Sequence, residues 1–160
     1  MPYAKIIAAA ALALSPAVAH AAAPAVERTG MPTGVIASSA TVPDGMKTVY
    51  ISGTTPSPLD PANPEDFGDT RTQTLSVLTK MKAQLATMGM GMGDIVKMTV
   101  FLVAPTPGGR MDSTAMNDVF KTFFGTAEQP NKPTRSTIQI AALGRPTMYV
   151  EIEAIAAKAP

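Results

Sequence analysis

Apolar and polar residues follow strand-like patterns in four segments of this chain. β-Branched and aromatic residues in 47–53 predict a strand, and the apolar run 95–103 predicts a strand that is central in a sheet or covered on both sides. Two alternating segments, 134–141 and 147–156, predict the last two strands. Because only the short stretch ALGRP lies between them, we expect these two strands to form an antiparallel hairpin.

Two segments show helical spacing instead. The first begins at a cap, Asp69 or Thr70, with Thr70 and Gln73 at the spacing of a capping box. The second begins near Asp112 and closes at Gly125. Their apolar stripes are Leu75, Leu78, Met81 or Lys82, Leu85 and Met88 in the first, and Met116, Val119, Phe120 and Phe123 in the second. These elements predict an α+β fold, a mixed β-sheet with two helices packed on one face.

The amino end has the pattern of a secretory signal peptide. Lys5 precedes an apolar core, 6–14, and Ala19-His20-Ala21 is a small-x-small cleavage pattern. The apolar run is shorter than the roughly 20 residues of a membrane span. We therefore predict a signal at 1–21 and an exported, periplasmic protein. An arm and first strand follow at 22–45, and a Pro-rich loop at 54–68 is long enough to suggest a function.

Composition then restricts the chemistry. The chain has no cysteine, and its one histidine, His20, leaves with the signal, so Ser-His or Cys-His catalysis is excluded. His- or Cys-based metal sites are excluded too, and we expect no metal and no cofactor. Removing Lys5 from the 13 basic side chains leaves 12, equal to the number of Asp and Glu residues. This balance argues against nucleic acid as the partner.

Arg135 opens an apolar strand, where a guanidinium with five donors needs an anionic partner. In the predicted hairpin it lies opposite about Ile152, and a small change of register brings Glu151 or Glu153 beside it. One interpretation is a cross-strand ion pair of about 0.2–1 kcal/mol. The other is a fork for a ligand carboxylate, with Glu151 handling protons or holding a water.

Ser52 and Asn117 are further hydrogen-bonding candidates, at a strand end and on the second helix. At such positions both residue types are commonly structural. The sequence pattern leaves the structural and the ligand-binding interpretations open.

Several stretches together resemble the RidA (YjgF) family over nearly all of 46–158. The specific part is PTRSTIQIAALGRPTMYVEIEAIA, and VYISG, GDIVKMTVFLV and MNDVFKTFFG stand in the expected order. We therefore interpret 46–160 as a RidA-like domain. The resemblance implies a chorismate-mutase-like fold, a homotrimer with three clefts between subunits, and an apolar exposed sheet face in the monomer.

The resemblance also implies hydrolysis of 2-imino acids, such as 2-iminopropanoate and 2-iminobutanoate, to 2-keto acids and ammonia. In the matching positions, Arg135 holds the substrate carboxylate and Glu151 is associated with water activation. The positions that line the cleft are Ser52, Gly53, Asn117 and Thr137. No cofactor, metal, nucleic acid or membrane span is implied.

The sequence departs from the family pattern at three places. Ile36 or a neighbour stands where the family has a tyrosine, Thr137 replaces a frequent cysteine, and Thr54 replaces a glutamine.

The family resemblance and these departures leave two functional hypotheses. The first is a periplasmic imine/enamine deaminase, and the alternative is a carboxylate-binding trimer that has lost turnover. The ribonuclease or translation-inhibitor role attached to some relatives is disfavoured by the neutral, histidine-free chain.

Overall fold

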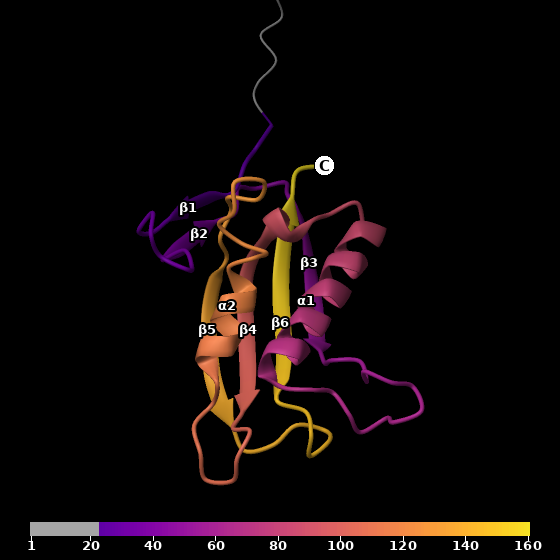
Figure 1. Ribbon diagram of the computed structural model, residues 1–160. Coiled ribbons are helices and arrows are strands. Elements are labelled where there is room, and N and C mark those ends of the chain that lie inside the picture. Colours follow the sequence, from indigo (N-terminus) through magenta and orange to yellow (C-terminus); the bar gives the residue numbers. More distant parts are fainter. Residues whose placement is uncertain (1–22) are drawn as a thin grey trace, which may run out of the picture.

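The computed structural model describes residues 23–160, so the predicted signal at 1–21 lies outside the described residues. The domain is a mixed sheet with two helices in front of it (Figure 1). The four-stranded sheet contains β3 (Lys47–Thr54), β4 (Ile95–Val103), β5 (Thr134–Ile140) and β6 (Val150–Lys158). The helices are α1 (Thr70–Thr87) and α2 (Ser113–Phe120), and a short 3-10 helix, η1 (Met92–Asp94), precedes β4. This α+β architecture is the predicted one.

The strand order β3-β6-β4-β5 differs from the predicted hairpin. β5 pairs in parallel with β4, and the chain crosses between them through α2. β6 then pairs antiparallel with both β3 and β4, so β4 separates β5 from β6. The hairpin prediction is wrong because a short connection does not require its two strands to be neighbours. Arg135 is therefore opposite Met98, two strands away from the expected Ile152.

The segment before the main sheet contains two short strands. β1 (Glu27–Thr29) and β2 (Ser39–Thr41) pair antiparallel as a separate sheet. Arg28 joins this small sheet to the domain, because its Nη2 donates to the carbonyl oxygens of Gly93 (3.0 Å) and Ile95 (3.3 Å). The expected arm is thus an ordered part of the fold.

Both helices begin at the predicted aspartates. Asp69 accepts from the amide of Thr72 at 2.8 Å, which lowers the pKa of its carboxyl below the ordinary value. Asp112 accepts from the amide of Ala115 at 2.9 Å. The capping-box prediction for Gln73 is wrong, because this side chain is buried and bonds to other segments. Leu75, expected in the buried stripe of α1, is 50% exposed.

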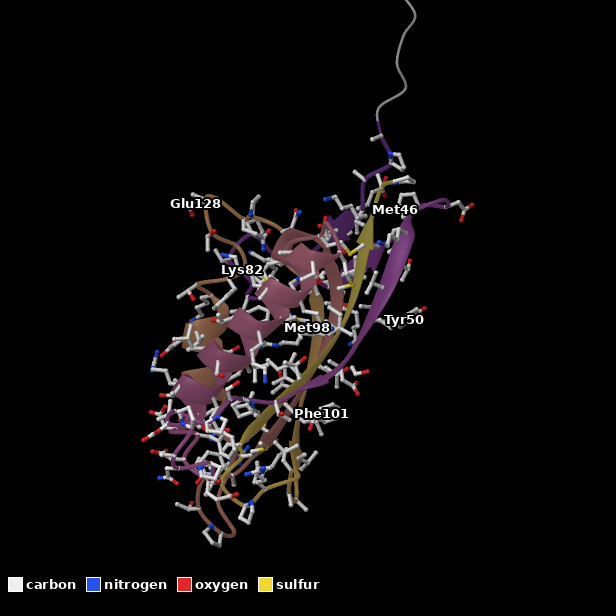
Figure 2. All side chains as sticks on the ribbon, turned by 90° about the vertical axis from the view of Figure 1, so that its right-hand side faces the viewer. Met46, Tyr50, Lys82, Met98, Phe101 and Glu128 are labelled. Carbon is white, nitrogen blue, oxygen red and sulfur yellow. The ribbon has the colours of Figure 1, made fainter. Side chains whose placement is uncertain are left out.

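The sheet has one covered face and one bare face, which Figure 2 shows edge-on. Met98 points toward the helices, whereas Tyr50 and Phe101 lie on the bare face. The bare face was expected to be apolar, but it also presents Lys97 and Glu153, which line a hollow of about 380 Å³. Among residues 23–160, no helix is long and apolar enough to cross a membrane.

Candidate functional site

Arg135 lies on the covered face of β5, beneath α2. Its register partner Met98 is fully buried under the helices, which places the arginine on the same side of the sheet. Nη2 donates to Oδ1 of Asn117 at 2.7 Å. The guanidinium carbon stands 4.3 Å from the centre of the Phe120 ring, a cation–π contact. Nη1 lies 3.6 Å from the sulfur of Met116. One face of one helix thus holds the guanidinium.

No carboxylate pairs with Arg135 in the described part of the chain. Burial lowers the pKa of its guanidinium, and no acidic group counters this effect. Nε is buried and has no hydrogen-bond partner among the described residues. A partly buried cation with unused donors is costly unless an anion meets it. The guanidinium of Arg135 is therefore partly buried with an unused Nε donor and without an anionic partner among the described residues.

Glu151 lies on the opposite, bare face of the sheet. It pairs in register with Phe101 of β4, whose side chain points away from the helices (Figure 2). On its other side the β3–β6 register shifts between Ile51 and Thr54, which is a β-bulge containing Gly53. A Cβ on Gly53 would overlap the carboxylate of Glu151. The bulge and the glycine together let the carboxylate lie against the backbone of β3.

We predict that Gly53→Ala displaces the Glu151 carboxylate while the fold survives. The overlapping atom is the end of a flexible side chain, so the free energy of unfolding should change by less than about 1 kcal/mol. Displacement of a catalytic group by about 1 Å can lower turnover by about 100-fold. Thermal melts and turnover assays on the variant measure both effects.

Gly91→Ala is the control, because nothing lies within 4 Å of its added Cβ. Unchanged turnover in Gly53→Ala would show that the contact is unimportant.

The predicted site residues form two groups. Arg135 and Asn117 contact each other on the covered face, and Thr137 lies two residues farther along that face. Ser52, Gly53 and Glu151 gather at the bulge on the bare side.

The ion-pair interpretation of Arg135 with Glu151 or Glu153 is therefore wrong. β4 stands between the strands, and the side chains point to opposite faces. Within one protomer the two proposed catalytic residues do not meet.

Phe120 and Met116 are contacts of Arg135 that the sequence did not reveal as such. Both were predicted, and are confirmed, as buried residues of α2. Their helical spacing marks a core stripe, and nothing in that spacing distinguishes a ring under a guanidinium from an ordinary core ring. Among residues 23–160, groups of three or more His, Cys, Asp or Glu side chains that could hold a metal are absent.

A mixed sheet with two helices on one face places the chain in the α+β class. The family model described as "Endoribonuclease L-PSP", the RidA/YjgF family, matches residues 37–158. The chain belongs to this family, and the resemblance seen in the sequence is confirmed.

Named relatives are similar over most of their length. The chain is 36% identical over 110 residues to the Escherichia coli K12 protein named "Putative reactive intermediate deaminase TdcF", covering 69% of this chain and 78% of the relative. It is 38% identical over 120 residues to Protein DfrA of Myxococcus xanthus, covering 74% and 82%.

Solved structures show the same fold. YyfB from Yersinia pestis, of the conserved Rid protein family, superposes with a TM-score of 0.63 at 26% identity, covering 79% of this chain and 89% of that one. E. coli TdcF with bound serine superposes with a TM-score of 0.56 at 30% identity, covering 83% and 99%.

Proposed function

We propose that this protein is a periplasmic imine/enamine deaminase that hydrolyses a small 2-imino acid to a 2-keto acid and ammonia. The observation that carries this proposal is Arg135, a partly buried guanidinium with unused donors and no carboxylate partner in the described chain. Such a fork binds a carboxylate through two parallel charge-assisted hydrogen bonds. Every 2-imino acid carries that group next to the reacting carbon.

The relatives support the reaction class. Reactive intermediate deamination is in the name of TdcF, and one solved structure of TdcF holds serine, an amino acid with a free carboxylate. The reaction needs a carboxylate anchor and a group that moves protons. Both residue types stand here at the positions that the family resemblance assigns, Arg135 and Glu151.

In the proposed mechanism the substrate carboxylate lies on the Arg135 fork, which Asn117 and Phe120 hold in place. Glu151 accepts a proton from a water as the water oxygen bonds to the imine carbon. That proton passes to the imine nitrogen and gives a carbinolamine. The hydroxyl proton is then transferred to the same nitrogen, the carbon–nitrogen bond breaks, and ammonia leaves as the carbonyl forms. Atoms balance with one water consumed, and no electron carrier is required.

Because Arg135 and Glu151 occupy opposite faces, we propose that two protomers build each site. β3 and β5 are the outer strands of the sheet, and in residues 23–160 neither pairs with another strand along its outer edge. Arg135 is on β5, and the bulge beside Glu151 is on β3. A head-to-tail contact that joins these two ends generates a closed ring when its rotation closes. Three copies, as the family resemblance implies, would give three sites.

The test of this function is direct hydrolysis. Imines are generated in the assay by an amino-acid oxidase acting on alanine or 2-aminobutanoate, and 2-keto acid release is compared with the uncatalysed rate. Acceleration by the wild type and its loss in Glu151→Gln are the expected results. Binding of 2-oxobutanoate without acceleration would instead favour the alternative, a carboxylate-binding trimer without turnover, consistent with Ile36 at the expected tyrosine position.

The family is described as an endoribonuclease family, but the composition of this chain does not favour RNA cleavage. Basic and acidic side chains nearly balance, at 13 and 12. The one histidine of the chain, His20, falls within the predicted signal. RNA capture generally needs a basic surface.

Periplasmic location rests on the amino-terminal pattern alone. We predict that the protein recovered from its native cell envelope begins at Ala22, within about two residues. Intact-mass analysis decides this, because retention of the first 21 residues adds a large, discrete mass. A full-length mass would overturn the export proposal and leave the deaminase proposal unaffected.

A further inference from the structure

Gln73 is a completely buried amide whose hydrogen bonds leave its own helix. Its Nε2 donates to the carbonyl oxygens of Gly68 (2.9 Å) and Thr147 (2.8 Å), and its Oε1 accepts from the amide of Tyr149 (2.7 Å). The side chain has 0% exposure. Both amide hydrogens and one acceptor site are thus used by two segments far apart in sequence. A buried polar group with this many partners specifies where those segments lie.

One of these segments is the Pro-rich loop, which was predicted at 54–68 and spans 55–69 in the structure. The other is the connection 141–149, and we call the two the clamped loops. Figure 1 shows both at the same end of the sheet. Thr147 also donates to the carbonyl oxygen of Glu65 at 2.7 Å. Arg145 reaches the carbonyl of Pro64 at 3.0 Å and the carboxylate of Glu65 at 2.6 Å. The Arg145–Glu65 pair is exposed and contributes little to stability. The buried hydrogen bonds of Gln73 therefore contribute most to holding the clamped loops together.

The clamped loops adjoin the half of the site that contains Glu151. The connection ends at Tyr149, directly before β6 and two residues before Glu151. The carbonyl oxygen of Tyr149 accepts from the amide of Val103 at 2.9 Å. The Pro-rich loop leaves the sheet just after the bulge that contains Gly53. The Glu151 carboxylate lies close against Gly53, with no room for a Cβ between them. A small shift in the start of β6 therefore moves the carboxylate.

We propose that Gln73 is a positioning residue that sets the place of the Glu151 carboxylate through Tyr149 and the start of β6. The catalytic consequence rests on the proposed deaminase function. The hydrogen bonds of Gln73 involve neither Arg135 nor Glu151. Its loss should therefore impair the step that uses Glu151 and spare carboxylate binding at Arg135 on the opposite face.

The kinetic test compares Gln73→Met with Thr74→Val. Thr74 is the next residue of α1 and is equally buried, but its hydroxyl donates to the carbonyl oxygen of Thr70 at 2.7 Å within the helix. In Gln73→Met, kcat for imine hydrolysis should fall at least about 10-fold, while the Kd of 2-oxobutanoate stays within about 2-fold. In Thr74→Val both constants should stay within about 2-fold. Gln73→Asn is one methylene too short to keep all three hydrogen bonds, and it replaces Gln73→Met if that variant does not fold.

A structural test needs no turnover. Amide hydrogen exchange at residues 149–151, measured by NMR, should be at least about 10-fold faster in Gln73→Met than in Thr74→Val. If the wild type does not hydrolyse imines, the proposed function fails, while faster exchange still supports the clamp. Exchange at 149–151 that is as slow as in Thr74→Val overturns the inference. The inference is also overturned if Gln73→Met changes kcat and Kd by no more than Thr74→Val does.

Discussion

Arg135→Met should abolish measurable binding of 2-oxobutanoate without destabilising the protein. A charge-assisted hydrogen bond contributes about 1.5–3 kcal/mol, so the loss of even one bond of the fork weakens binding about 10- to 150-fold. The free energy of unfolding should change by less than about 1 kcal/mol. The variant loses the hydrogen bond to Asn117 and the cation–π contact with Phe120, but it also removes a partly buried charge that has no carboxylate partner in the described chain. Calorimetric titration and thermal melts measure the two quantities.

Arg28 provides a matched control within the same chain. It is also a partly buried arginine whose pKa is lowered by burial, but its guanidinium nitrogens donate to the carbonyl oxygens of Val26, Gly93 and Ile95. Arg28→Met leaves these acceptors without a donor, and each such loss costs about 1–3 kcal/mol when buried. We therefore expect the control to lower the melting temperature and leave binding unchanged.

Arg135→Lys separates charge from geometry. The ammonium keeps the charge but cannot present two parallel donors in a plane, so affinity should still fall about 10-fold or more. If Arg135→Met melts at a lower temperature, as Arg28→Met should, and the wild type binds neither pyruvate nor 2-oxobutanoate, then the arginine is structural. Equal affinity of the Arg135→Lys variant and the wild type for 2-oxobutanoate would remove the fork from the mechanism.

Local sequence signals predicted the elements well because those elements are determined locally. The strand expected at 95–103 is observed at Ile95–Val103, since an uninterrupted apolar run fits a strand buried in the centre of a sheet. Both helix starts follow from Asp69 and Asp112, whose carboxylates can reach first-turn amides. These features depend on neighbours within a few residues.

The strand order could not be obtained in this way. Insertion of β6 between β3 and β4 depends on contacts between residues about 50 to 110 positions apart, which leave no mark in local periodicity. The error in strand order carried over to the site, since the hairpin would have made Arg135 a neighbour of Glu153. Gln73 shows the same limit. Its spacing from Thr70 suits a capping box, yet its partners lie in loops that only the folded chain brings close.

The proposal that two protomers share each site leads to the second large effect. Arg135→Met and Glu151→Gln should each be inactive alone, because each lacks one half of every site. When the two variants are unfolded, mixed in equal amounts and refolded together, activity should return. A site is intact when one protomer supplies Arg135 and its neighbour supplies Glu151. With random assembly into a ring this occurs at about one quarter of the sites.

A site contained within one protomer gives a different result, because neither variant then has an intact site and the mixture stays inactive. Wild type mixed equally with the double variant Arg135→Met/Glu151→Gln provides the control. In this control mixture about one quarter of the sites are intact if two protomers share each site. About half are intact if each site lies within one protomer. Light scattering on the same samples should give about three times the chain mass. The fraction of activity recovered therefore measures whether Arg135 and Glu151 meet across a subunit boundary, as we propose from their separation within the protomer.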